Sequence, residues 1–591
     1  MRRGILGQGF LRGLTALALA LCLPLCRAQV DTPLVQPEAA SGRYTKPGWT
    51  YRHEAVAAAN PLAAEAGERM LHSGGSAVDA AVAVQLVLGL VEPQSSGLGG
   101  GAFMLSWDGH KLEAWDGRET APAGSRPDQF LRDGKPLSMS EAVPGGLSVG
   151  TPGALAMLAQ AHAEQGRLKW ARLFEPAIEL ADKGFAISPR LALLLQGQPK
   201  LALDRQAAAY FLDAEGKPWP VGHVLRNPAY AEVLRRIAKA GPQAFYRGAV
   251  AADIAARVKN AAQPGSLAEA DLAGYRALKR EPLCAQWRRY RLCGMPPPSA
   301  GLITVAQTLI MLGPNPAPLS VPLLHRFVEA SRLAFADRAQ YVADPDFVPA
   351  PAGDWHSLLE ADYLRERAAL IGERAMPNPA AGVPHGATLA FAAQVEQVEN
   401  GTSHVSIVDR QGHALALTTS VESAFGSGLM SDGGTGLPGG FMLNNQLTDF
   451  SFRPTDADGK PVANRLEPGK RPRSSMAPTL VFDADSGRLV MSLGAPGGSV
   501  IIPFVSKTLL GTLAWGMDAQ RAVDLPNFGS LGGPVLLETG GFDAATVRGL
   551  EALGHRVQWL DLPSGIQVIE RRKQGWFGAA DPRREGVVRG D

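Results

Sequence analysis

The stretch Asn400-Gly401-Thr402-Ser403-His404-Val405-Ser406 marks a change in the character of the chain. Before it, residues 150–275 are rich in Ala, Leu and charged residues, which predicts helices, whereas residues 350–400 hold many Pro, Gly and Ala without a clear period. We expect part of that second range to be exposed and flexible. After it, β-branched and apolar residues predict strands at 403–408 and 413–420. The stretch therefore opens a β-rich final third.

Further elements on both sides of this stretch complete an α+β pattern. Residues 479–482 and 489–492 predict a second hairpin. Ala77–Leu90 predicts a helix that is apolar on nearly every side, as is typical of a helix buried in a large core. Ser76, with Asp79 three residues later, resembles a capping box that would begin this helix. Other predicted elements are helices at Asn60–Leu71 and Val321–Tyr341 and a strand at Phe103–Trp107.

The composition is that of a large ordered protein without a charge bias. The 591 residues are 46% hydrophobic, which is enough to form a large buried core. The formal net charge is +2 and no half of the chain is strongly basic, so nothing points to a nucleic-acid partner. The eleven histidines show no paired metal spacing, so we expect no metal site.

The first 28 residues have the pattern of a signal peptide. Arginines near the start precede the apolar run Leu14–Leu25, and Cys26-Arg27-Ala28 offers a cleavage site. The run is too short to span a bilayer. An uncleaved signal anchor is the alternative, and a lipid-attached Cys26 is less favoured because a leucine precedes it. We expect the mature chain to be periplasmic or secreted, with no membrane attachment after signal removal.

Two of the four cysteines lie in this signal, which leaves Cys284 and Cys293 in the mature chain. If Arg288-Arg289 forms a two-residue turn, the two cysteines face each other across a hairpin, at one of its close, non-hydrogen-bonded pairs. An exported protein meets oxidising conditions, so we expect a disulfide between them. The alternative is a pair of buried free thiols.

Two glycine-containing motifs match catalytic patterns but occur in the wrong context. Gly146-Leu147-Ser148-Val149-Gly150 has the spacing of a nucleophile elbow, which needs a strand before it and a helix directly after it. Here loop residues precede it, and Thr151-Pro152-Gly153 follows. Gly97–Ala102 fits a loose dinucleotide-binding pattern, but a helix precedes it and a strand follows it, the reverse of the required order. We therefore assign no function to either motif.

Longer blocks of the sequence resemble one enzyme family, the γ-glutamyltranspeptidases. They occur in family order and extend over residues 52–584, nearly the whole mature chain. The resemblance implies an α+β fold of the N-terminal-nucleophile hydrolase type, a four-layer αββα sandwich. The blocks are Ala57–Ala64, Gly75–Ala83, Val91–Gly101, Asn444-Asn445-Gln446, Lys470–Met476 and Ala495–Ser499.

The family's nucleophile is a threonine that becomes N-terminal by self-cleavage, and the resemblance assigns this role to Thr402. A hydroxyl group alone is a poor nucleophile, but an N-terminal threonine carries its α-amine as a base. That amine, with a pKa near 8, is available unprotonated near neutral pH. Cleavage after Gly401 would give a heterodimer of a large subunit (29–401) and a small catalytic subunit (402–591).

The resemblance also assigns a pocket for a γ-glutamyl group, which carries one carboxylate and one ammonium. Arginine suits a carboxylate because its guanidinium can bind both oxygens. The amide hydrogens of glycines would stabilise the oxyanion, because glycine lets the chain approach closely. The assigned residues are Arg118, Ser474 and Ser475 for the carboxylate, Gln446 and Asp449 for the ammonium, Gly497 and Gly498 for the oxyanion, and Ser420 as support for the nucleophile's hydroxyl.

Three features depart from the family pattern. Glu422 occupies a position where many relatives have Asn, and we expect it to help bind the ammonium. Arg473 precedes the two serines where Leu is usual. The stretch from Asp449 to Lys470 corresponds to a lid, which is rather short here and lacks a tyrosine found in some relatives. These differences bear on the choice of acyl group and acceptor, and not on the nucleophile.

The resemblance implies a glutathione hydrolase and γ-glutamyltransferase that needs no cofactor. Its threonine would take the γ-glutamyl group of glutathione or a related donor and pass it to water, an amino acid or a dipeptide. One rival is an acylase of the same fold that acts on glutaryl-type β-lactam side chains or poly-γ-glutamate. A glutaryl group lacks the ammonium, so Gln446 and Asp449 argue against it. Another is an exported, non-catalytic binding protein.

Overall fold

The computed structural model describes residues 40–313, 317–395, 397, 399 and 401–591. The predicted signal peptide, residues 1–28, lies outside these ranges, as does Asn400. In the described part of the chain no helix is long and apolar enough to cross a membrane.

Two seven-stranded antiparallel sheets form the centre of the fold. The hairpin predicted after Thr402 is present and lies in the middle of one sheet, with Val405 opposite Leu417. The hairpin predicted near residue 486 lies in the other sheet. In spatial order the first sheet, here the nucleophile sheet, contains β23 (Val587–Gly590), β2 (Ala55–Ala58), β12 (Ser403–Val408), β13 (Ala414–Ser420), β3 (Gly101–Trp107), β4 (Leu112–Gly117) and β9 (Leu278–Arg280). The second sheet contains β1 (Trp49–Tyr51), β22 (Trp576–Ala580), β21 (Gln567–Arg571), β17 (Leu489–Gly494), β16 (Thr479–Asp483), β11 (Tyr290–Gly294) and β10 (Leu283–Trp287).

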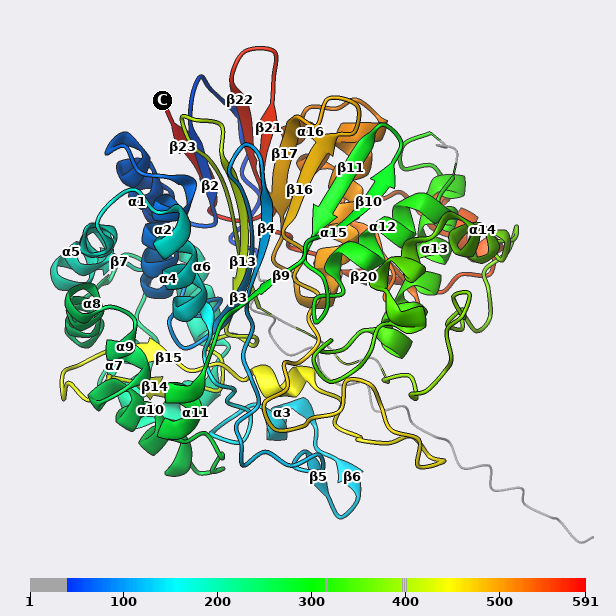
Figure 1. Ribbon diagram of the computed structural model, residues 1–591. Coiled ribbons are helices and arrows are strands. Elements are labelled where there is room, and N and C mark those ends of the chain that lie inside the picture. Colours follow the sequence, from blue (N-terminus) through cyan, green and yellow to red (C-terminus); the bar gives the residue numbers. More distant parts are fainter. Residues whose placement is uncertain (1–39, 314–316, 396, 398, 400) are drawn as a thin grey trace, which may run out of the picture. The chain divides into compact units, whose positions relative to one another are not determined.

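The two sheets pack face to face, with β12 and β13 against β17 and β21. Helices cover the outer face of each sheet, which gives the predicted αββα sandwich (Figure 1). The nucleophile sheet is covered by α1 (Pro61–His72), α2 (Ala77–Val91) and α4 (Ala154–Gln165). The second sheet is covered by α12 (Gly301–Met311), α15 (Ile501–Leu509) and α16 (Ala519–Asp524).

Both faces of the central strands are buried, because each sheet is sandwiched between two layers. In β12, Val405 and Ile407 pack into the core shared with α2, whereas His404 and Ser406 point toward the second sheet. The hydroxyl of Ser492, on β17, donates to the Ser406 hydroxyl at 3.1 Å across the gap between the sheets. The interior next to the start of β12 is therefore polar in part.

The helix predicted at Ala77–Leu90 is α2, and all of its residues are buried. Ser76 caps its N-terminus through the amide of Asp79, and the Asp79 carboxylate accepts from the Ser76 amide, so the predicted capping box is present. The helix predicted at Val321–Tyr341 has those bounds and is α13. The other helices before residue 280 are α3 (Met139–Ala142), α5 (Glu175–Lys183), α6 (Pro189–Gln196), α7 (Arg205–Phe211), α8 (Pro228–Ala240), α9 (Gln243–Tyr246), α10 (Ala249–Lys259) and α11 (Glu269–Gly274).

No clear period was found in residues 350–400, but this range contains one helix, α14 (Ala361–Ala369). It is short and rich in charged residues, and only Tyr363, Leu364 and Arg367 of it are buried, so too few apolar positions were available to show a period. An ion pair attaches α14 to α13. Arg367 donates to the buried carboxylate of Asp337 on α13 at 2.9 Å.

The rejected elbow motif lies in a loop between α3 and α4. Ser148 is buried, and its hydroxyl donates to the carbonyl of Val143 at 2.7 Å. No strand leads into it and the following helix begins only at Ala154. The other glycine motif lies between α2 and β3, in the order helix then strand. Neither has the context that its catalytic pattern needs.

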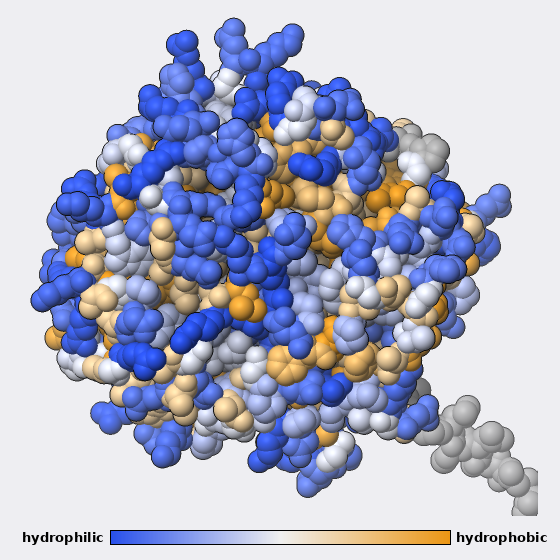
Figure 2. Space-filling model, viewed as in Figure 1, coloured by the Kyte–Doolittle hydropathy of each residue, from blue (hydrophilic) through white to orange (hydrophobic). Residues whose placement is uncertain are grey.

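The cysteine hairpin is the free edge of the second sheet. β10 and β11 pair with Trp287 opposite Tyr290 and Cys284 opposite Cys293, which is the predicted register. The two cysteines form a disulfide in the structure. Away from this edge the molecular surface is largely polar: hydrophilic residues cover most of the face in Figure 2, with apolar ones scattered between them.

Candidate active site

Thr402 directly precedes β12 and is buried in the uncut chain, with 2% of its surface exposed. Its hydroxyl donates to the carbonyl of Gly401, the residue before it, at 2.6 Å. The same carbonyl accepts a second hydrogen bond, of 2.5 Å, from the hydroxyl of Ser420 at the end of β13. Gly401 has φ +59°, a left-handed conformation that favours glycine. Two hydroxyl groups thus converge on the carbonyl between Gly401 and Thr402.

Ser420 is held in place by the residue two positions after it. The amide of Glu422 donates to the Ser420 hydroxyl oxygen at 2.8 Å, so the hydroxyl hydrogen is free to point at Gly401. Glu422 has φ +75°, which is strained for a residue with a side chain. Its carboxylate accepts from Asn445 at 2.5 Å and from Ser423 at 2.6 Å. These hydrogen bonds offset the backbone strain at Glu422 and fix the turn that positions Ser420.

His404 is buried, and its ring contacts residues of both central sheets. Burial lowers its pKa to about 3, so the ring is neutral at physiological pH. One ring nitrogen contacts the Thr418 hydroxyl at 2.8 Å and the other contacts the Ser406 hydroxyl at 3.1 Å. The ring packs on Gly494 at the end of β17, where a Cβ atom would lie 2.3 Å from it. His404 thus sets the position of β12 against the second sheet.

Gly497 and Gly498 lie in the loop between β17 and α15, three and four residues after that contact. Both have positive φ angles, +138° and +55°, and a Cβ atom on Gly497 would lie 2.8 Å from the Phe504 ring. The loop therefore needs glycine at these positions, and it starts from the strand end that contacts His404. The two predicted oxyanion donors are therefore joined by a short stretch of chain to the strand end that contacts His404.

Arg118 follows β4 and is fully buried at the other side of the site. Its guanidinium donates to the carbonyls of Pro472 and Arg473, at 3.1 and 2.8 Å, and to the carboxylate of Asp449 at 2.5 Å. Gln446 donates to the same Asp449 oxygen at 2.6 Å. Sequence reasoning assigned Arg118 and Asp449 to opposite charges of a ligand, and in the uncut chain they are paired with each other.

The two predicted serines form different contacts. The Ser474 hydroxyl accepts from the Met476 amide at 3.1 Å. The Ser475 hydroxyl accepts from Arg338 of α13 at 2.8 Å, and the Ser475 amide donates to the carboxylate of Glu399 at 3.1 Å. Arg338 and Glu399 also form an ion pair. Neither residue was identified from the sequence, although Glu399 lies three positions before Thr402.

Burial dominates the electrostatics of this pocket. It raises the pKa of Glu119 to about 8, against the opposing effect of the Arg118 charge. It also raises the pKa of Asp449 to about 6; Arg118 opposes this shift and the charge of Glu399 adds to it. The Glu399 carboxyl lies among Arg338, Arg473 and Arg118, which hold its pKa below the usual range although burial acts in the opposite direction. The pocket is thus a buried set of paired charges of both signs.

The predicted lid, from Asp449 to Lys470, contacts the segment that leads to Thr402. The amide of Ala392 donates to the carbonyl of Pro461 at 2.8 Å. The Asn464 side chain donates both to Gln394 and to the carbonyl of Asp449, at 2.9 and 2.8 Å. In the uncut chain the lid is therefore hydrogen-bonded to Ala392 and Gln394, in the segment before Thr402.

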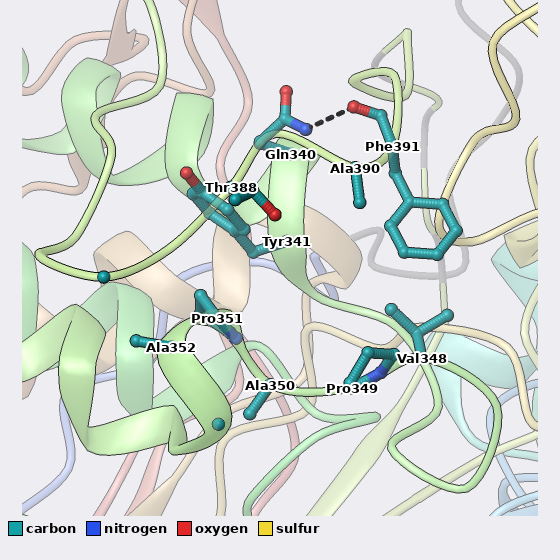
Figure 3. Close-up of a pocket in the computed structure, with 12 residues that line it drawn as sticks. Gln340, Tyr341, Val348, Pro349, Ala350, Pro351, Ala352, Thr388, Ala390 and Phe391 are labelled. Carbon is teal, nitrogen blue, oxygen red and sulfur yellow. Dashed lines mark hydrogen bonds between the residues drawn. The ribbon is translucent and has the colours of Figure 1, made fainter.

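Two surface cavities lie outside this site. One, of about 270 Å³, is lined by the end of α13 and by residues 348–353 and 386–391; Figure 3 shows Gln340 in its wall, bonded to the carbonyl of Phe391. The other, of about 620 Å³, lies next to Tyr275 and Arg471. Neither is lined by a predicted site residue. In the described ranges no group of three or more His, Cys, Asp or Glu could hold a metal ion.

Comparisons with known proteins identify the relatives of this chain in sequence and in fold. The sequence model described as Gamma-glutamyltranspeptidase matches residues 63–590. The glutathione hydrolase proenzyme of Bacillus subtilis (strain 168) is 36% identical over 553 residues, which are 90% of this chain and 91% of the relative. The structure of a cephalosporin acylase from Bacillus halodurans superimposes with a TM-score of 0.80 at 27% identity, over 93% of this chain and 97% of that one.

A γ-glutamyltranspeptidase structure from Helicobacter pylori matches with a TM-score of 0.51 at 29% identity, over 57% of this chain and 94% of that one. The family match covers most of the αββα unit, all but β1, β2 and the start of α1, and it includes Thr402 and each pocket residue described above. The chain belongs to the γ-glutamyltranspeptidase family.

Proposed function

We propose that this protein is a self-processing γ-glutamyltransferase and glutathione hydrolase whose nucleophile is Thr402. The observation that carries the proposal is the geometry at Gly401, whose carbonyl accepts hydrogen bonds from the hydroxyls of both Thr402 and Ser420. Hydrogen bonds to a carbonyl oxygen stabilise the negative charge that develops there when the carbon is attacked. The protein's relatives include several glutathione hydrolase proenzymes.

Self-cleavage would begin with attack of the Thr402 oxygen on the Gly401 carbonyl carbon. The Thr402 amide nitrogen leaves as an amine after it gains a proton, and an ester joins Gly401 to the Thr402 oxygen. Water then hydrolyses the ester, which frees the Gly401 carboxylate and the Thr402 hydroxyl. The products are the proposed subunits, residues 29–401 and 402–591, and the new amine is the base that the transfer reaction needs.

In the transfer reaction the Thr402 oxygen would attack the γ-amide carbonyl of the donor. The Thr402 amine takes the hydroxyl proton and passes it to the leaving amine, and an acyl-enzyme forms. The amides of Gly497 and Gly498 stabilise the oxyanion. Water, an amino acid or a dipeptide then takes the acyl group by the reverse sequence of proton transfers. No step needs a cofactor.

The charges of the pocket favour a zwitterionic γ-glutamyl donor over a glutaryl donor. Arg118, Ser474 and Ser475 supply groups for a carboxylate, whereas Asp449, helped by Gln446 and Glu422, suits an ammonium. A donor's carboxylate would engage Arg118, which is the partner of Asp449 in the uncut chain. An acyl group without an ammonium would then leave Asp449 without a full counter-charge, and a broken buried pair costs about 3–5 kcal/mol, so the pocket disfavours an acyl group with only a carboxylate. The acylase alternative retains one specific support, the likeness to the cephalosporin acylase fold.

The site of action follows from the proposed signal peptide. Removal of residues 1–28 would release the chain to the periplasm or the medium, where Cys284 and Cys293 meet oxidising conditions. The two subunits would remain together as a heterodimer, because strands from both sides of the cut pair within one sheet. β12, after the cut, lies between β2 and β13.

The proposal is tested by replacing the nucleophile. Purified wild type should show two bands of roughly 39 and 20 kDa, in proportion to length from the 62.3 kDa of the whole chain, since the base exists only after cleavage. Thr402→Ala should remain one band and should not release the anilide from a chromogenic γ-glutamyl anilide. Wild type should do so, and faster when glycylglycine is present. An active enzyme that stays in one piece would refute the mechanism, and an inert one would favour a binding protein.

A further inference from the structure

The carboxylate of Glu399 occupies a binding position in the acyl pocket. One of its oxygens accepts from the Arg338 guanidinium, and the other accepts from the Ser475 amide at 3.1 Å. Arg338 also donates to the Ser475 hydroxyl at 2.8 Å, so each of the three residues contacts the other two. Arg338 has no exposed side-chain surface and Glu399 has 9%. A carboxylate is therefore held by buried donors at the pair of serines proposed to bind the donor's carboxylate.

The surroundings of this carboxylate are those of a binding site for an acid. Arg338 and Arg473, and at longer range Arg118, hold the pKa of Glu399 below its usual range against the effect of burial. Asp449 is close enough for the Glu399 charge to raise its pKa. Glu399 thus contacts Arg338 and Ser475 and lies within electrostatic reach of Asp449, in the region proposed to bind the α-carboxylate of a γ-glutamyl group.

The described residues of the segment that carries Glu399 contact the end of α13. Gln340 donates to the carbonyl of Phe391 at 2.6 Å (Figure 3), and the Gln394 amide donates to the carbonyl of Ala339 at 2.9 Å. Glu399 is two residues before Gly401, the last residue of the proposed large subunit. Cleavage would make this stretch a chain end, and the ends of a chain are where order is most readily lost.

We propose that Arg338 is a specificity-determining residue of the mature enzyme, which binds the donor's carboxylate together with Ser475, and that Glu399 fills this position until the chain is cut. The exchange keeps the charge constant, because one carboxylate replaces another. It is favoured by the cost of leaving a buried arginine without a counter-ion. The uncut chain would therefore be blocked at the carboxylate position as well as lacking its base. This inference rests on the proposed function, because it concerns the acyl pocket of that reaction.

The first experiment uses chains that cannot cut themselves, with L-glutamate as the probe and titration calorimetry as the measurement. Thr402→Ala keeps Glu399 in the pocket and should bind L-glutamate weakly. Thr402→Ala combined with Glu399→Ala should bind it at least about tenfold more tightly, since the site no longer has to be vacated. Adding Arg338→Gln to the double variant should abolish the gain. Thr402→Ala with Glu373→Ala is the matched control, because it removes an exposed glutamate from the stretch between α14 and Thr402, and it should behave as Thr402→Ala alone.

Each other outcome is decisive. Equal affinities of Thr402→Ala and the Glu399→Ala double variant would overturn the proposal, as would a double variant that binds neither L-glutamate nor glutarate. If the double variant binds glutarate but not L-glutamate, the carboxylate site stands and the γ-glutamyl part of the proposed function fails. Should the alanine variant not fold, Glu399→Gln keeps the shape, removes the charge and serves in its place, with the same expected gain.

The second experiment examines the mature enzyme. Arg338→Gln should raise KM for a γ-glutamyl anilide at least about tenfold and change kcat much less, because a contact made equally in ground and transition states affects binding alone. Arg338→Lys retains the charge and should recover part of the loss. A variant with unchanged KM, or one in which Lys is no better than Gln, would show that Arg338 only supports the fold.

Discussion

Two buried clusters of charge in this molecule differ in where their partners come from. The first, the C-terminal cluster, consists of Arg583, Glu538 and Asp581. Arg583 donates to both carboxylate oxygens of Glu538, at 2.6 and 2.7 Å, and to Asp581 at 3.1 Å. It also donates to the carbonyls of Val523 and Leu525. All these partners of Arg583 follow Thr402, so cleavage at Gly401 leaves them in the same subunit as Arg583. Arg43, which contacts Glu538 at 3.4 Å and has a side chain that is 54% exposed, lies before the cut.

The second, the pocket cluster, consists of Arg118, Arg338, Glu399 and Asp449. Here the pairs cross the proposed cleavage site or depend on the segment before it: Arg118 pairs with Asp449, and Arg338 pairs with Glu399. The same residue types thus serve two purposes. A cluster with permanent partners stabilises the fold, whereas a cluster whose partner can leave is suited to bind a charged ligand.

The largest effect is expected from breaking the C-terminal cluster. Arg583→Met removes the buried counter-ion of Glu538 and Asp581 and should lower the free energy of unfolding by about 3–5 kcal/mol. Urea unfolding measures this, and kcat/KM of the folded fraction should not change. Arg572→Met is the matched control. The Arg572 side chain is 39% exposed, so its ion pair with Glu570 should contribute less than about 1 kcal/mol to stability. Equal losses in both variants would contradict the comparison.

Removing one charge from the pocket cluster should affect activity more than stability. Asp449→Asn keeps the shape and should lower kcat/KM for γ-glutamyl donors by about 2–4 kcal/mol, roughly 30- to 1000-fold. A glutaryl donor has no ammonium and should lose far less, and self-cleavage should persist because it involves no glutamyl ligand. Adding Glu422→Gln should cost more than either single change. Equal losses for both donors, or a wild type that prefers the glutaryl anilide, would favour the acylase.

The pH dependence of kcat/KM tests the same role of Asp449 as the partner of the ammonium. The raised pKa of Asp449, about 6, means that this carboxyl is charged only above that pH in the uncut chain. Release of Glu399 removes one of the causes of the shift, so in the mature enzyme the pKa should lie below 6. We expect kcat/KM for a γ-glutamyl anilide to fall as pH decreases through that range, about tenfold per unit. The same limb in Asp449→Asn would show that another group titrates.

The raised pKa of Asp449 also predicts how the free energy of unfolding changes with pH. The folded chain holds this proton more tightly than the unfolded chain does, so the stability contributed by the protonated form is lost as pH rises from about 4 toward 6. Asp449→Asn should remove this dependence from the free energy of unfolding of the uncut Thr402→Ala chain. Urea unfolding at several pH values measures it, and an unchanged slope would contradict the assignment.

The smallest effect is expected at the sheet edge, remote from both clusters. The Cys284–Cys293 bridge closes a short loop, so Cys284→Ser with Cys293→Ser should lower stability by about 2 kcal/mol, at the modest end of the usual range. Activity should not change. Thiol counting on denatured, unreduced mature protein should find no free thiol, and two would refute the bridge in the mature protein.

Local pattern was enough to predict the elements that matter most. The capping box at Ser76, the full length of α13 and both central hairpins follow from short-range rules of helix capping, period and turn. The cysteine register could be counted from a two-residue turn. α14 was missed because its few buried residues show no period and its anchor is an ion pair to another helix.

The sequence by itself determined the family, the αββα fold and the proposed nucleophile, because long motifs in a fixed order carry that information. Only the tertiary structure decided how the pocket charges pair. A buried arginine such as Arg338 and an exposed one look alike in a sequence, since burial depends on what packs above them. The contact of Glu399 with Ser475, 76 residues later, depends on how distant parts of the chain pack together. Long-range contacts of this kind fix the energy of each charge, and no local pattern encodes them.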